Sequence, residues 1–94
     1  MDIRGLKELR EYYLTLSDAT RLRILEQLAR RELTVSEIAR ILRMSQPLVS
    51  WHLHRLKRTG LVRMQRNGRE VHCSLDHTRL QEYNRQFESL IASQ

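Results

Sequence analysis

The sequence contains few of the residues that build cross-linked, metal-bound or membrane-spanning proteins. Its 94 residues include one cysteine, one proline and three glycines. A single cysteine excludes an internal disulfide framework and a CxxC metal or redox pair. No segment approaches the roughly 20 consecutive apolar residues that a membrane-spanning helix needs. The first 13 residues are charged from the second position and lack the apolar run of a secretory signal. We therefore expect a cytoplasmic protein with no membrane partner.

Chain length and net charge indicate the number of domains and the kind of partner to expect. With 94 residues, the chain is expected to form one domain, residues 1–94, near the lower end of what buries an adequate core alone. Small size favours self-association. Seventeen Lys and Arg against eleven Asp and Glu give a net charge of +6. This balance attracts polyanions, of which nucleic acid is the usual one; the alternative is a basic surface that only keeps the protein soluble.

Apolar residues recur at helical spacing in the first third of the chain. Over residues 2–15 they predict an amphipathic helix whose apolar stripe is Ile3, Leu6, Leu9, Tyr13 and Leu16. Ser17 and Asp18 are good N-cap residues for a second helix. In that helix the predicted buried stripe is Leu22, Leu25 and Leu28, with Ile24 beside it.

A helix-turn-helix pattern occupies Leu33–Leu56. Thr34 and Glu37 form a T-x-x-E capping box, which starts a helix predicted to carry inward the residues Val35, Ile38, Ala39 and Leu42. Ser45 caps the next helix, Pro47 falls in its first turn, and Gly60 suits its end. Two helices joined by such a short turn are typical of proteins that place the second helix in the DNA major groove.

The periodicity then changes from that of a helix to that of strands. Apolar residues alternate with polar ones over Val62–Gln65 and Val71–Leu75, and Asn67-Gly68 between them is a strong hairpin signal. Asp76 can cap a last helix, whose apolar positions are Leu80, Tyr83, Phe87, Leu90 and Ile91. The predicted fold is mainly α with a small β-hairpin: a winged helix-turn-helix (ααααββα) with an extra helix at each end.

The helix that follows Ser45 has two chemically different faces. At about 100° per residue, Val49, Leu53 and Leu56 share one side. The N-terminal tip, the opposite side and its flanks carry the predicted DNA contacts of this helix, which are Ser45, Gln46, Pro47, Ser50, Trp51, His54, Arg55 and Arg58. Among them, Gln46 can pair bidentately with adenine, and the arginines can neutralise phosphates.

Two residues of the same helix have competing interpretations. Helical phase points Trp51 outward toward DNA, although a tryptophan is more usually a core or interface residue. His52 lies at the edge of the apolar side, where a hydrogen-bonded packing histidine is the expected interpretation.

The hairpin and the terminal helices complete the predicted binding unit. Arg66 and Arg69 flank the turn, where they suit the minor groove or adjacent phosphates, although a solvated hairpin tip is by itself commoner. One helix and one wing bind weakly, so we expect a homodimer on near-palindromic double-stranded DNA. Its predicted interface is formed by Ile3, Leu6, Leu9, Tyr13, Tyr83, Phe87 and Leu90. The aromatic residues of this set could equally belong to the core of one chain.

Several segments resemble the ArsR/SmtB family of small bacterial and archaeal repressors. LSDATRLRIL (Leu16–Leu25), ELTVSEIA, MSQPLVSWHLHRLKRTGLV and the RNGRE wing stand in that family's order and spacing, over roughly residues 14–76. The resemblance implies a homodimeric repressor that leaves its operator when an effector binds. It also implies DNA contacts in the wing from Arg66 to Arg69 and at the positions matching Gln46, Pro47, Ser50 and Trp51.

Three positions depart from the family's usual residues. Pro47 and Trp51 replace small or basic residues, so the operator sequence cannot be borrowed from other members. Arg43 stands where the turn often has Gly, and a positive φ there costs about 1 kcal/mol.

The family's metal sites are not matched. Its metal sensors place cysteines in the third-helix box, where this sequence has Thr34 and Ser36. The other family site uses Asp and His near the start of the last helix, followed by His and Glu or His. Asp76 is present, but the remaining positions hold Thr78, Ser89 and Ala92. Because one carboxylate does not make a site, we expect no metal and no cofactor.

His72, Cys73, Asp76 and His77 are the remaining group of potential ligands. Strand alternation points Cys73 inward and His72 outward, so we do not expect them to converge on a metal. Cys73 also has no resolving partner within the chain, which leaves an intersubunit disulfide as its only conceivable redox pairing.

The leading hypothesis is a sequence-specific dimeric transcriptional regulator, a repressor of ArsR type without the usual metal sites. The alternatives are a winged-helix protein-interaction module and a nonspecific architectural DNA binder. We do not expect an enzyme, because no nucleophile–base pair, phosphate loop or carboxylate pair occurs at usable spacing.

Overall fold

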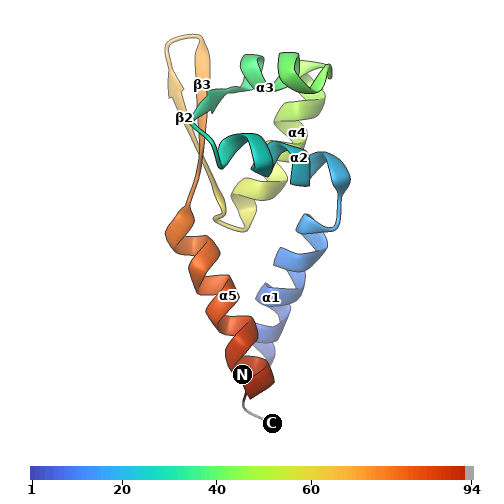
Figure 1. Cartoon of the computed structure of the whole chain (residues 1–94), viewed down its shortest axis with the longest axis vertical. Coiled ribbons are helices and arrows are strands. Elements are labelled where there is room, and N and C mark those ends of the chain that lie inside the picture. Colours follow the sequence, from blue (N-terminus) through green and yellow to red (C-terminus); the bar gives the residue numbers. More distant parts are fainter. Residues whose placement is uncertain (93–94) are drawn as a thin grey trace.

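The computed structural model describes residues 1–92 and consists of a head carried on a two-helix stem (Figure 1). The last two residues of the predicted 1–94 domain lie outside this described part. The elements in chain order are α1 (Ile3–Leu16), α2 (Ala19–Leu28), β1 (Leu33–Thr34), α3 (Val35–Leu42), α4 (Gln46–Arg58), β2 (Val62–Asn67), β3 (Glu70–Leu75) and α5 (His77–Ala92). The order confirms the predicted winged helix-turn-helix with an extra helix at each end.

The shape follows from the position of the terminal helices. α2, α3, α4 and the sheet form the head, while α1 and α5 run away from it and converge, so that the start of α1 lies near the end of α5 (Figure 1). The molecule is accordingly elongated, with principal extents of 47 × 22 × 22 Å. Within residues 1–92, no helix is both long and apolar enough to cross a membrane.

The helices begin where the sequence supplies side-chain caps. Asp18 accepts the backbone N–H of Arg21 at 3.0 Å and starts α2, whereas Ser17 instead closes α1 by donating its hydroxyl to the Leu14 carbonyl at 2.7 Å. The predicted capping box is present: Thr34 Oγ1 accepts from the Glu37 N–H at 3.1 Å, and Glu37 Oε1 accepts from the Thr34 N–H at 2.9 Å. Because a cap satisfies N–H groups that the helix leaves unpaired, these residues fix where each helix starts.

The core confirms the predicted inward faces of α3 and α4. Its fully or nearly fully buried members there are Val35, Ile38, Ala39, Leu42, Val49, Leu53 and Leu56. α2 differs from the prediction, because Leu22 is 51% exposed while Ile24 and Leu28 are buried. Its buried face is the i, i+3, i+7 set of Arg21, Ile24 and Leu28, so a buried arginine occupies a position that apolar periodicity did not count.

The buried side of α1 is also rotated from the expected stripe. It consists of Leu9, Tyr12 and Thr15, whereas Tyr13 is 39% exposed. Tyr12 stacks on Tyr83 of α5 with ring centroids 3.7 Å apart and an angle of 6° between planes. This stacking joins the two stem helices, α1 and α5, within one chain.

The wing is a three-stranded antiparallel sheet in the order β1-β3-β2. The predicted hairpin is present, with Asn67 opposite Glu70 and the φ of Gly68 at +65°. The two-residue strand β1, which the sequence analysis did not predict, pairs Leu33 with Cys73. A strand that short has no readable periodicity and exists only because β3 offers it a partner.

The turn between α3 and α4 adopts the left-handed conformation expected from its position in the motif. Arg43 has φ 56° and ψ 48° and caps α3. A non-glycine residue stores a local strain of about 1 kcal/mol there. This conformation allows three residues to connect α3 to α4 and leaves the N-terminus of α4 at the surface of the head.

Candidate nucleic-acid interface

The outward side of α4 is an accessible, largely polar surface of the head. We call it the reading face and define it by the predicted helix contacts Ser45, Gln46, Pro47, Ser50, Trp51, His54, Arg55 and Arg58. Of these, Ser50 and Arg55 are half-buried and the others are exposed. The buried stripe of Val49, Leu53 and Leu56 lies on the other side of the same helix, so packing against the core fixes the direction in which the reading face points.

Trp51 is a surface residue rather than a core residue. It is 54% exposed, and the guanidinium carbon of Arg55 lies 5.4 Å from its ring centroid. Leu48, which the sequence analysis did not select, is 45% exposed one turn earlier. A protein recognises a thymine methyl group through an apolar contact placed beside polar groups. Leu48 could have been selected from the sequence, because it is an apolar residue outside the phase of the buried stripe.

The ring of His54 is oriented by its own helix. Its Nδ1 lies 2.8 Å from the Ser50 carbonyl oxygen, so Nδ1–H donates to that oxygen. In the neutral ring, Nε2 is then left as an acceptor for an outside donor.

The N-terminus of α4 favours anions. Ser45 Oγ accepts the backbone N–H of Leu48 at 3.3 Å, and Pro47 in the first turn has no N–H to satisfy. The remaining N–H groups and the positive end of the helix dipole attract a phosphate at this point.

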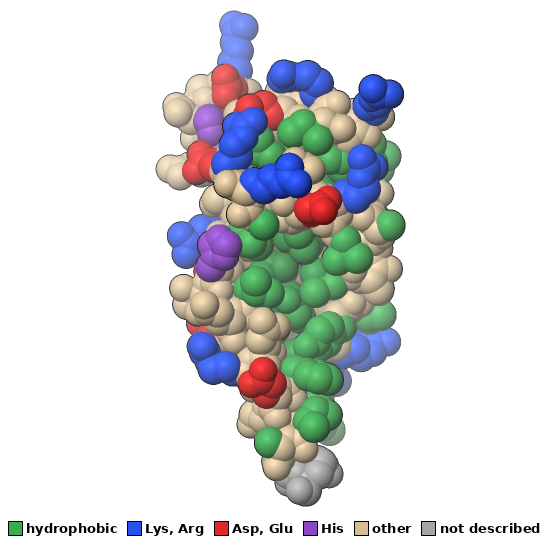
Figure 2. Space-filling view, viewed as in Figure 1, with side chains coloured by type: hydrophobic (Ala, Val, Ile, Leu, Met, Phe, Trp, Pro, Cys, Tyr) green, Lys and Arg blue, Asp and Glu red, His purple; other side chains and the backbone are tan. Residues whose placement is uncertain are grey.

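The wing adds a second basic surface. Arg66 and Arg69 are both exposed at the hairpin tip, and within residues 1–92 neither forms an ion pair. Figure 2 shows lysine and arginine side chains distributed around the head on the face that it displays. Unpaired arginines on a protruding hairpin are free to meet phosphates.

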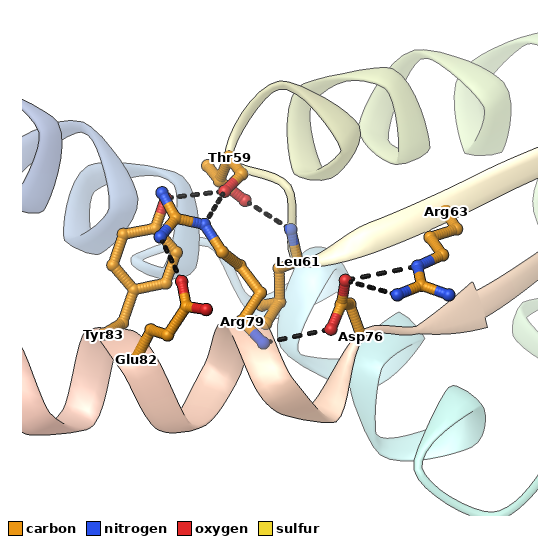
Figure 3. A network of polar contacts seen from close by, with 7 residues as sticks. All are labelled: Thr59, Leu61, Arg63, Asp76, Arg79, Glu82 and Tyr83. Atoms are coloured by element: carbon orange, nitrogen blue, oxygen red, sulfur yellow. Dashed lines mark hydrogen bonds and ion pairs between the residues drawn. The ribbon is translucent and has the colours of Figure 1, made fainter.

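A polar network joins the end of α4, the wing and α5 (Figure 3). Asp76 Oδ1 accepts the Arg79 backbone N–H at 3.0 Å and so caps α5. Its other oxygen accepts from Arg63 Nε at 3.2 Å and from Nη2 at 2.9 Å. The Arg79 N–H, followed by the Arg63 guanidinium, holds the pKa of Asp76 below its usual value.

The other half of this network holds the C-terminus of α4. The Tyr83 hydroxyl donates to the Thr59 carbonyl at 2.6 Å, and Arg79 Nη2 donates to the Tyr83 oxygen at 2.9 Å. Glu82 accepts from Arg79 Nη1 at 2.9 Å. The reading face and the wing are thereby fixed to the stem (Figure 3).

Two of the positions that match the metal-binding positions of the family's sensors, Thr34 and Asp76, are engaged in protein contacts here. The hydroxyl of Thr34 caps α3, and Asp76 caps α5 while bonding Arg63. These side chains do not fit a metal site, because their oxygens already have partners within the protein. Within residues 1–92, no group of three His, Cys, Asp or Glu side chains is arranged to hold a metal ion.

His72 and Cys73 diverge, as strand alternation predicted. His72 Nδ1 lies 3.2 Å from Glu32 and its Nε2 lies 3.4 Å from Glu70. Cys73 instead points into the core, where it is fully buried. Burial, followed by the charge of Glu32, raises the pKa of the Cys73 thiol to about 11.

We expect Cys73 to be unreactive in the native protein. At pH 8, the raised pKa lowers the thiolate fraction by about 100-fold relative to an ordinary cysteine, and burial blocks access as well. A colorimetric thiol assay should therefore give a rate at least about 100-fold lower in buffer than in denaturant. Equal rates in the two conditions would show that Cys73 is accessible.

The stem carries an apolar surface that the single chain leaves uncovered. Its exposed large hydrophobic residues are Ile3, Leu6, Tyr13, Leu14, Phe87 and Ile91, and Leu22 of α2 is exposed as well. Figure 2 shows hydrophobic side chains gathered in a band that extends from the middle of the molecule down the stem. Leu14, Leu22 and Ile91 are exposed in the same way, although they were not among the residues predicted for the interface.

Two residues of the predicted interface belong to the core of one chain. Leu9 and Tyr83 are each 3% exposed, so they cannot present a surface to a partner, and Leu90 is only partly exposed. For Tyr83, the alternative of an intramolecular core residue is the correct one. Tyr13 and Phe87 stay on the surface, edge to face with ring centroids 5.6 Å apart.

The fold and this surface define a winged helix-turn-helix regulatory protein. Residues 18–64 match the family model for the bacterial regulatory protein, arsR family, and the chain belongs to that family. It is 36% identical over 75 residues to the transcriptional repressor SmtB homolog of Synechocystis, an alignment covering 80% of this chain and 57% of that protein. The chain thus spans little more than half the length of the first curated relatives it matches.

Solved structures agree with this family. An ArsR-like transcriptional regulator from Rhodococcus superposes with a TM-score of 0.87 at 31% identity, over 97% of this chain and 86% of that one. A homodimeric winged helix-turn-helix DNA-binding domain from Mycobacterium bovis gives a TM-score of 0.77 at 25% identity, over 99% and 88%. The family consists of regulatory proteins, in agreement with the prediction that the chain is not an enzyme.

Proposed function

We propose that this protein is a homodimeric, sequence-specific DNA-binding repressor of transcription that acts in the cytoplasm without the family's metal sites. The observation that carries the proposal is the reading face of α4, where polar, basic and aromatic side chains stand opposite a fully buried stripe. An exposed helix with this chemistry, followed by a wing with two unpaired arginines, suits the major groove and the adjacent backbone.

Each part of the reading face has a distinct task. Gln46, at the N-terminal tip of α4, pairs with adenine in the major groove, while Trp51 and Leu48 contact thymine methyl groups. Arg55 and Arg58 neutralise phosphates, as do the wing arginines, so they supply affinity rather than sequence preference.

The apolar side of the stem supports the dimer. Phe87 is 43% exposed, Leu6 42% and Ile3 72%, and a second copy would remove this surface from water. The solved M. bovis domain is homodimeric. Two-fold symmetry would set two reading faces about one DNA turn apart, which calls for a near-palindromic operator.

Trp51 provides the test of this function, because it is the only tryptophan and belongs to the reading face. Its emission is followed while the protein is titrated with an operator selected from random DNA and with a scrambled duplex, over a salt series. We expect a strong preference for the operator and steep salt dependence. Equal affinity for both duplexes would indicate an architectural binder, and no binding at low salt would indicate a protein-interaction module.

Adding zinc should leave the operator affinity unchanged; release of the operator by stoichiometric zinc would contradict the metal-free part of the proposal.

Replacing Gln46 by Ala should relax sequence preference at one base pair of each half-site. The loss of a bidentate contact corresponds to about 1–3 kcal/mol of discrimination, or roughly 5- to 150-fold, at that position alone. Repeating the operator selection with Gln46→Ala measures the effect, and Arg69→Ala serves as the control that weakens all sequences alike. Identical sequence profiles for Gln46→Ala and the wild type would refute the base contact.

A further inference from the structure

A buried arginine lies between the stem and the DNA-reading helix. Arg21, in the first turn of α2, is 8% exposed and shares the inward face of α2 with Ile24 and Leu28. Burying a guanidinium is costly unless its N–H groups are satisfied. The hydrogen-bond partners of Arg21 therefore indicate which parts of the structure the residue connects.

The side chain of Arg21 contacts two other helices, α1 and α4. Its Nε donates to the Thr15 carbonyl, in the last turn of α1, at 2.6 Å. Its Nη1 lies 3.2 Å from Nδ1 of His52, on α4. His52 is itself only 6% exposed, as expected for a packing histidine. One side chain thus ties the stem helix α1 to α4.

The chemistry of this contact fixes the protonation state of His52. A guanidinium can donate hydrogen bonds but cannot accept them, so His52 Nδ1 must be the acceptor and the ring proton must lie on Nε2. A protonated His52 would turn an N–H toward Arg21 and place two positive charges 3.2 Å apart in a buried site. The contact therefore exists only while His52 is neutral.

We propose that Arg21 is a positioning residue for DNA recognition: through neutral His52 it fixes the angle between the stem and α4, and protonation of His52 releases α4. This inference rests on the proposed function and adds to it a pair of residues that touch no DNA. The angle matters because the stem is the proposed dimer interface, so it sets the separation and direction of the two reading faces. The emission of Trp51 should report a change in the protonation of His52, because the two rings lie edge to face with centroids 4.9 Å apart.

The charged groups around His52 determine the direction of the pH dependence. Burial is the largest cause that lowers the pKa of His52; Arg21 of α2 and Arg55 of α4 lower it further, while Asp18 at the start of α2 opposes them. A histidine whose pKa is lower in the folded protein contributes stability that is complete above its usual value near 6.5 and is lost as pH falls. Acidification should therefore weaken operator binding, although added positive charge alone would strengthen it.

Operator affinity at pH 7.5 and pH 5.5 tests this sign in the wild type and in two matched variants. His52→Asn keeps an acceptor oxygen near the position of Nδ1 but cannot be protonated, and His77→Asn removes an exposed histidine at the start of α5, outside the reading face and the wing. We expect about tenfold weaker binding at pH 5.5 for the wild type and for His77→Asn. For His52→Asn we expect constant or tighter binding. Coinciding pH profiles for the wild type and His52→Asn would overturn the proposal.

A second measurement on the free protein separates this inference from the proposed function. Arg21→Met removes the charge at similar length, so the midpoint of the Trp51 emission change with pH should rise above that of the wild type. An unchanged midpoint in the folded variant would refute the Arg21–His52 contact, whatever happens with DNA. If Arg21→Met does not fold, the same midpoint is read in wild type and His52→Asn, and its persistence in His52→Asn would refute the assignment. Loss of all operator preference in the wild type would instead refute the proposed function and leave the emission result standing.

Discussion

Replacing Phe87 by Glu is expected to convert the dimer into monomers and to lower operator affinity by roughly 100-fold or more. Phe87 is 43% exposed on the stem, packed edge to face against Tyr13. In a symmetric dimer, the substitution would bury one unpaired carboxylate from each copy. Each monomer would retain its reading face but lose the gain from binding two half-sites together.

The control for this change lies on the same helix. Ser89→Glu adds the same negative charge at an exposed position, about 160° around α5 from Phe87 at 100° per residue. Sedimentation velocity and operator titration should show an intact dimer and nearly normal affinity for Ser89→Glu. A Phe87→Glu protein that remained dimeric and bound the operator normally would show that the dimer uses another surface.

Removing both wing arginines is expected to have the second largest effect. Arg66→Ala combined with Arg69→Ala would take up to four phosphate contacts from the dimer, two from each wing. The slope of log affinity against log salt should become shallower by about 3 to 4. Because these contacts carry no sequence information, binding to operator and scrambled DNA should fall together and the preference between them should persist.

A matched change on the stem distinguishes phosphate contacts from net charge. Arg4→Ala combined with Arg85→Ala removes the same charge from exposed positions on α1 and α5. This variant should keep nearly the wild-type salt slope. Equal slopes for the two double variants would mean that the wing does not meet the DNA backbone.

Local signals in the sequence were sufficient for most of the fold. The caps at Asp18, Thr34 and Asp76 act over three or four residues, so they could be predicted without tertiary information. The phase of α4 was equally clear, because Val49, Leu53 and Leu56 mark one face without competition. The outward direction of Trp51 followed from that phase.

Features that depend on distant partners were not predictable in the same way. β1 exists only where Leu33 meets Cys73, and neighbouring residues do not report that pairing. Tyr12 was overlooked in favour of Tyr13, because adjacent tyrosines both fit a helical stripe until packing against Tyr83 selects one.

The same limit applies to the buried polar pair. His52 was expected to be hydrogen-bonded, but its partner lies 31 residues away in the sequence. A signal was nonetheless present, because Arg21 stands three and seven residues before Ile24 and Leu28, in phase with the buried face of α2. A charged residue at such a position is a candidate for a buried contact with another element.

The spacing of the half-sites tests the central claim most directly. Operator affinity is measured by Trp51 emission before and after about five base pairs, half a turn of DNA, are inserted at the operator's centre of symmetry. If a dimer reads two half-sites with paired α4 helices, the insertion should reduce affinity to that of scrambled DNA. Unchanged affinity would show that each chain binds its half-site independently and would contradict the account of a dimer that reads two half-sites with paired helices.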